Sequence, residues 1–108
     1  MKQGHKEVHF SDANDNPAGG HTWGVGFAIA WQNGPLGAIG TPERKEPNGA
    51  FVEDLIQAVI GRIHFYQQSK FNSNDNAEAL VHLHKAAEAL DRRTKNREAR
   101  QVEGTHKV

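Results

Sequence analysis

Two apolar stripes with helical spacing, one on each side of a short polar break, restrict the folds open to this chain more than any other feature. Residues three or four positions apart share one face of an α-helix, so each stripe predicts a helix with one buried side. The stripes consist of Phe51, Val52, Leu55, Ile56, Val59, Ile60 and Ile63, and of Leu80, Leu83, Ala87 and Leu90. Because the break at 69–74 is short, the helices are predicted to be antiparallel neighbours in a helical hairpin.

Residues that satisfy unpaired backbone groups indicate where the two helices begin and end. Asn48 can cap the first helix, because its side chain can accept from the first-turn N–H groups. Asp75, followed by Glu78, is a variant of the capping box and predicts the start of the second helix. Gly104 is expected to stop that helix. The predicted helices cover about 48–68 and 76–100.

The part before residue 47 has the pattern of strands and turns. Residues 6–10 are a short strand candidate, and 11–20 is dense in turn formers. Residues 22–32 alternate strictly, which predicts one long strand. Its large residues, Trp23, Val25, Phe27, Ile29 and Trp31, would share one face, and Gly24, Gly26, Ala28 and Ala30 the other. Small residues on that second face would let a helix, a partner subunit or a ligand approach the backbone closely.

These patterns predict an α+β fold in which a small N-terminal antiparallel β element precedes a C-terminal antiparallel α-helical hairpin. The 108 residues are expected to form a single domain, 1–108, with a β and loop part at 1–47 and the hairpin with a short tail at 48–108. Only 36% of the residues are hydrophobic, so the chain can bury only a modest core by itself. We therefore expect an oligomer in which association supplies further burial.

Composition excludes several classes of function. Thirteen basic and thirteen acidic residues give a formal net charge of zero, which argues against a general nucleic-acid coat. The absence of cysteine excludes disulfides and thiol nucleophiles. No HExxH pattern, Walker loop or GxGxxG motif is present, so we predict no metal and no cofactor. The start of the chain is too polar for a signal peptide and no apolar stretch could span a membrane, so a cytoplasmic protein is expected.

The end of the second helix is cationic. The run RRTKNREAR places Arg93, Arg97 and Arg100 on one stripe that continues the edge of the apolar seam. Guanidinium groups match phosphate oxygens with forked donors, so this stripe is a candidate phosphate-binding site. The alternative is structural: cations offset the helix dipole, and the arginines could pair with Glu46, Glu53 and Asp54.

The bend of the hairpin is the second candidate surface. Phe65, Tyr66 and Phe71 flank it, and Asn76 opens the second helix. An aromatic ring can stack on a base and an amide can read an adenine edge, although the same residues could merely cap the core and the helix. Bend and arginine end lie on the order of 25 Å apart along the second helix. An antiparallel pair of chains would bring them together at one ligand.

Three stretches carry a family resemblance: NPAGGHTWGVGFAIAWQNGPLG at 16–37, PNGAFVED at 47–54 and REARQVEGTH at 97–106. With the hairpin between them, they resemble the phage-encoded Thoeris anti-defence sponge proteins, which share a helical hairpin domain with anti-CBASS sponges. The resemblance implies a protein that binds cyclic ADP-ribose isomers in the infected bacterial cell without degrading them. It also implies a homodimer that assembles into a homohexamer and, for some relatives, binding of cyclic di- or trinucleotides.

The resemblance also implies roles for individual residues. Phe65 or Tyr66 would stack on the adenine, and Asn76 would hold its edge. Arg93 and Arg97 would hold the diphosphate. Arg44, which precedes PNGAF, is a candidate for a second site that takes cyclic oligonucleotides.

Two other classes of function stay open at this point. One is an enzyme that hydrolyses such a ligand, with Glu98 or a histidine as general base, although no spacing singles one out. The other is a structural oligomerisation module whose arginines only form salt bridges.

Overall fold

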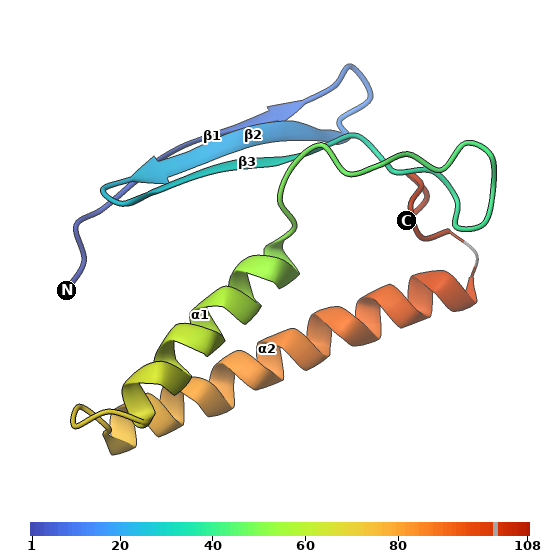
Figure 1. Ribbon diagram of the computed structural model, residues 1–108. Helices are drawn as coiled ribbons and strands as arrows, with labels where there is room; N and C mark the ends of the chain where they lie inside the picture. The colour runs from blue at the N-terminus through green and yellow to red at the C-terminus, as the bar shows by residue number, and fades with distance from the viewer. Residues whose placement is uncertain (101) are drawn as a thin grey trace. The chain divides into compact units, whose positions relative to one another are not determined.

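The computed structural model describes residues 1–100 and 102–108 and contains three strands followed by two helices (Figure 1). The elements are β1 (Lys6–Ser11), β2 (Pro17–Gly24), β3 (Phe27–Asn33), α1 (Val52–Gln67) and α2 (Asn74–Ala99). The predicted α+β arrangement is confirmed. Two compact units make up the chain, Met1–Phe51 with Arg100–Val108, and Val52–Ala99. The expectation of a single domain over 1–108 stays a prediction, as does the oligomer.

The first unit contains an antiparallel sheet in the order β1-β2-β3 (Figure 1). The prediction of one strand over 22–32 is wrong, because the chain reverses within it. Gly24 pairs with Phe27, which leaves Val25 and Gly26 as a two-residue turn. Gly26 has a φ of 85°, a conformation that glycine adopts at no steric cost and that ends the strand here.

The turn also changes which side chains share a face of the sheet. Trp23 lies opposite Ala28, and His21 lies opposite Ala30 and Val8, so these five side chains share one face. The predicted grouping of Trp23 with Ile29 and Trp31 is therefore wrong, since these two belong to the other face. On that other face the Trp31 indole nitrogen donates to the Thr22 hydroxyl at 2.8 Å.

The turn segment before β2 is shorter than the predicted 11–20, because Pro17–Gly24 already belongs to the sheet. The reversal is confined to 12–16, where the Asp12 carboxylate accepts from the backbone N–H groups of Asn14 and Asn16 at 2.8 and 3.0 Å. These hydrogen bonds hold the pKa of Asp12 below its ordinary value. Gly20 is required within β2, since a Cβ there would overlap the Val8 carbonyl oxygen.

Asn48 does not cap α1, contrary to the prediction, because α1 begins only at Val52. Its amide oxygen accepts from the Asn33 N–H at 2.8 Å, and its amide nitrogen donates to the Asn33 carbonyl at 2.9 Å. The next residues continue along β3, where Ala50 forms an isolated parallel bridge with Trp31. Asn48 thus fastens the connection to the sheet edge instead of starting the helix.

The second unit is the predicted hairpin of α1 and α2 (Figure 1). Its most buried apolar side chains are Ile60 and Leu80, which are 5% and 9% exposed. The rings of His64 and His84 lie 5.9 Å apart, edge to face, between the two helices. Part of the apolar surface stays uncovered in the single chain, with Val52, Val59 and Val81 exposed.

The helix ends differ in detail from the prediction. α2 begins at Asn74, and the Ser73 hydroxyl accepts from the Asn76 N–H at 3.0 Å. Ser73 is therefore the N-cap, and the predicted box of Asp75 with Glu78 is wrong. α2 ends at Ala99, five positions before Gly104, so that glycine is not the direct stop. In the described part of the chain, no helix is long and apolar enough to cross a membrane.

Candidate functional site

Three exposed side chains form a cluster on the last turns of α1, which we call the aromatic cluster: Arg62, Phe65 and Tyr66. The Phe65 and Tyr66 rings lie 6.0 Å apart, centroid to centroid, and are inclined by 61°. Phe65 is 54% exposed and Tyr66 is 38% exposed. The alternative in which Phe65 caps the core is thus not realised in the single chain. Exposed rings are suited to stacking on a base, which the sequence predicted for this position.

The bend joins this cluster to Asn76 through a short series of hydrogen bonds. The Ser69 hydroxyl donates to the Tyr66 carbonyl at 2.6 Å and accepts from the Phe71 N–H at 3.1 Å. The Phe71 carbonyl in turn accepts from the Asn76 amide nitrogen at 3.3 Å. This fixes the amide of Asn76, which is half-buried, and the sequence-predicted aromatic and asparagine belong to one local structure.

A second pair of bonds closes the bend. The Gln67 amide nitrogen donates to the Ser73 carbonyl at 3.0 Å, and the Gln67 amide oxygen accepts from the Ser73 N–H at 3.0 Å. Since Ser73 also caps α2, the last turn of α1 and the first turn of α2 are held to each other by side chains. The bend is therefore organised before any ligand arrives, which lowers the ordering cost of binding.

The three arginines of the cationic end have different surroundings. Arg93 is exposed and forms no hydrogen bond or ion pair with the described residues. Arg97 is only 9% exposed and is engaged with other groups. Arg100 donates to the Val108 carbonyl at 2.8 Å. An ion pair on this part of α2 joins Lys95 to Asp91 at 2.9 Å, and the Asp91 carboxylate raises the pKa of Lys95.

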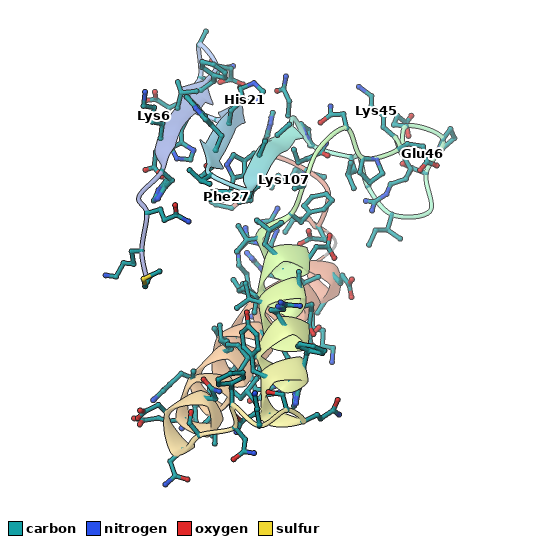
Figure 2. All side chains as sticks on the ribbon, turned by 60° about the vertical axis from the view of Figure 1, so that its left-hand side comes forward. Lys6, His21, Phe27, Lys45, Glu46 and Lys107 are labelled. Carbon is teal, nitrogen blue, oxygen red and sulfur yellow. The ribbon has the colours of Figure 1, made fainter. Side chains whose placement is uncertain are left out.

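One chain does not bring the bend and the arginine end together, because they lie at opposite ends of α2 (Figure 1). Asn76 and Arg93 are seventeen positions apart in this uninterrupted helix, which is about 25 Å at 1.5 Å per residue. A ligand the size of a nucleotide cannot touch both in one chain. Glu46, one of the predicted partners for the arginines, lies on the loop between β3 and α1 next to Lys45 (Figure 2).

Arg44 contacts the backbone of the loop between β3 and α1. Its Nη1 donates to the Gly37 carbonyl at 2.9 Å, and the Gly37 N–H donates to the Gly104 carbonyl at 2.7 Å. Gly104 must be glycine, because its φ is 82° and a Cβ would meet both the Gly37 carbonyl and the Arg44 guanidinium. Arg44 is exposed and so combines a contact at this crossing with access to solvent.

The sheet carries an open groove of about 530 Å³ over its exposed apolar face. Val8, His21, Trp23, Ala28, Ile29 and Ala30 line it. The sequence predicted Ala28 and Ala30 on the face opposite Trp23, and this is wrong, because they share the face of the groove with it. His21 and, on the neighbouring strand, Lys6 can be found on the sheet in Figure 2.

The histidines do not build a metal site within the described residues, where no group of three or more metal-ligating side chains is arranged to hold an ion. His5 and His9 instead contact the two carboxylate oxygens of Glu7, at 3.0 and 3.7 Å. The hydrogen bond from His5 is the main reason that the pKa of Glu7 is lowered.

A curated phage protein is similar in sequence to this chain. No protein-family model matches the chain. Over 78 residues the chain is 42% identical to the curated protein Thoeris anti-defense 1 of Bacillus phage SBSphiJ7. This chain is a homologue of the Thoeris anti-defence proteins. The aligned part covers 72% of this chain and 51% of the phage relative, so the chain spans about half the length of the Thoeris protein that it matches. The match confirms the resemblance that the three motifs indicated.

Proposed function

We propose that this protein is a phage anti-defence protein that binds a cyclic ADP-ribose isomer and withholds it, without cleavage, from the Thoeris effector. The observation that carries this proposal is the bend, where exposed aromatic rings and a fixed asparagine amide form one local structure. A ring for stacking and an amide for an adenine edge are the two groups that base recognition needs. The homology to a protein named for anti-Thoeris defence supports the same conclusion.

The binding site is composite in this proposal. The bend of one chain supplies Phe65, Tyr66 and Asn76, and the arginine end of an antiparallel partner supplies the phosphate contacts. Arg93 is the arginine best placed for this, since it is exposed and has no described partner. Arg97 and Arg100 already contact groups of their own chain, and they would support the stripe.

Association into a homodimer and then a homohexamer is part of the same proposal. Among the described residues, the buried apolar side chains are Ile60 and Leu80, and the helices leave several valines exposed. Association would cover that apolar surface and so stabilise the protein. The sites would lie at the interfaces between chains, because the bend supplies only the base contacts and the arginine end supplies only the phosphate contacts.

We favour withholding over hydrolysis, since the groups that contact the proposed ligand are aromatic, amide and guanidinium groups. The competing enzyme would need a general base beside the phosphates. Glu98, the carboxylate nearest in sequence to Arg97, is exposed. The proposed place of action is the interior of the infected bacterial cell, where such signals are made.

The test is retention followed by release. The purified chain is incubated with extract from cells with an activated TIR enzyme, washed, heated, and the released small molecule is identified by mass spectrometry. Recovery of an intact cyclic ADP-ribose isomer, in proportion to the protein, is the expected result. Recovery of a linear product would support the enzyme, and an empty eluate would contradict binding altogether.

A second site at Arg44, for cyclic di- or trinucleotides, is the finer part of the proposal. The exposed guanidinium of Arg44 beside the Gly37–Gly104 crossing supports it. The same retention experiment, run with synthetic cyclic oligonucleotides, tests it through an Arg44→Ala variant. Loss of their retention, with the cyclic ADP-ribose isomer still retained, is the expected outcome.

A further inference from the structure

Arg62 is the member of the aromatic cluster that the family motifs and the sequence prediction did not single out. Its guanidinium carbon lies 4.8 Å from the centroid of the Phe65 ring and 4.9 Å from that of Tyr66. Its Nε donates to the Tyr66 hydroxyl at 3.1 Å. The spacing explains the contact, since residues three and four positions apart meet on one helix face.

These three contacts hold a charged group in one place although it is exposed. An arginine on a helix surface ordinarily moves among many rotamers, and ordering it for a ligand carries an entropy cost. Here the two rings attract the cation and the hydroxyl fixes one edge of the guanidinium plane. The four N–H donors on the two Nη atoms have no hydrogen-bond partner among the described residues.

The cation therefore presents an unused fork of donors beside the surface on which a base would stack. We propose that Arg62 is a ligand-binding residue that contacts the anionic phosphate next to the stacked base, and that the Tyr66 hydroxyl positions it. This inference rests on the proposed function and adds a cation from the same chain as the aromatic rings. In a cyclic ADP-ribose isomer, the base and the diphosphate belong to one closed ring. Ring closure keeps the diphosphate near the stacked base, within reach of a cation at the edge of that base.

A purely structural role for Arg62 fits the contacts less well. The guanidinium forms no ion pair with a described carboxylate, and the rings it contacts are themselves exposed. Exposed cation–π contacts contribute little to folding, about 0.5–1 kcal/mol. The arrangement therefore stabilises the fold only slightly. A cation that is already held beside a stacking surface strengthens the binding of an anionic nucleotide much more.

The experiment uses the full chain and a purified cyclic ADP-ribose isomer as the probe, with affinity measured by calorimetry at low and high salt. Arg62→Met removes the charge but keeps an unbranched side chain, and Arg62→Lys keeps the charge but lacks the planar fork. Tyr66→Phe removes only the hydroxyl that positions Arg62. Lys85→Met is the matched control, because it deletes one exposed cation of α2 that has no described partner.

We expect Arg62→Met to bind at least tenfold more weakly at low salt, with a smaller deficit at high salt because ions already screen the lost contact. Arg62→Lys should recover the salt dependence and only part of the affinity. Tyr66→Phe should bind a few-fold more weakly, and Lys85→Met should bind like the unmodified protein. A structural role alone would leave the salt dependence of binding unchanged.

The outcomes separate this inference from the proposed function. If the unmodified protein binds the probe and Arg62→Met binds within twofold at both salts, Arg62 does not contact the ligand while the proposed function stands. If the unmodified protein does not bind the probe, both are overturned. Thermal unfolding shows whether each variant is folded. Should Arg62→Met fail to fold, the Nε–H resonance of Arg62 in the unmodified protein decides: a shift on adding the probe supports the contact, and an unmoved resonance overturns it.

Discussion

The two ends of the hairpin hold candidate binding groups in different ways. At the bend, local hydrogen bonds through Ser69 and Gln67 fix the backbone and leave the aromatic side chains exposed. At the arginine end, Arg97 is buried and Arg100 is exposed but contacts its own chain. Arg93 is exposed and has no partner among the described residues. Residues of one type on one helical stripe are therefore not equivalent. Their surroundings divide them between stability and recognition.

The largest expected effect comes from removing one group at each end. Tyr66→Ala and Arg93→Ala should each weaken binding of the cyclic ADP-ribose isomer by roughly tenfold to a hundredfold, since base stacking alone contributes about 1–3 kcal/mol. Stability should change by less than about 0.5 kcal/mol in Arg93→Ala, because Arg93 is exposed, and by about 1 kcal/mol in Tyr66→Ala, which also loses the contacts with Arg62. Calorimetry and urea unfolding measure the two quantities.

Mixing the two variants tests whether the bend of one chain and the arginine end of its partner form one site. In an antiparallel dimer that contains one chain of each kind, one site has both defects and the other has none. Random mixing through unfolding and refolding should therefore restore full affinity at roughly a quarter of the sites. Restoration of no sites would show that both groups act within a single chain and would contradict the composite site.

The next effect separates Arg97 from Arg93. Arg97→Ala should lower the free energy of unfolding by about 2–3 kcal/mol, because it removes a buried charged group and leaves its partners unsatisfied. Arg93→Ala is the matched control and should unfold at nearly the same urea concentration as the unmodified protein. Equal midpoints for the two variants would mean that the burial of Arg97 has no energetic consequence.

The smallest effect concerns the bend. Ser73→Ala removes the acceptor for the Asn76 N–H and should cost about 1 kcal/mol of stability. Since Asn76 is part of the proposed site, ligand affinity should fall a few-fold as well. Asp75→Ala serves as the control: it removes the cap that the sequence suggested, and a larger stability loss there than in Ser73→Ala would show that Asp75 is the true cap.

Much of the candidate site could be anticipated from helical spacing. The stripes locate α1 and α2 to within a few residues, and the bend with its aromatics and Asn76 follows from where the stripes stop. Arg62 was missed although its signal is present, an arginine three and four positions before two aromatic residues. Nothing in the stripe itself distinguishes Arg97 from Arg93, because both continue the same seam and only packing decides which is buried.

The sequence by itself determined the hairpin, because an apolar period near 3.6 has one solution that buries it. Only the tertiary structure decided how the segment 22–32 folds. An alternating pattern is compatible with a single strand and with two strands joined by a two-residue turn, and in the second case opposed residues such as Trp23 and Ala28 come from opposite halves of the alternation. Asn48 illustrates the same limit, since a side chain that can cap a helix can equally bind a strand edge. The Asn48 side chain can bond either to a helix N-terminus or to a strand edge, and the path of the connection between β3 and α1 decides which of the two it meets.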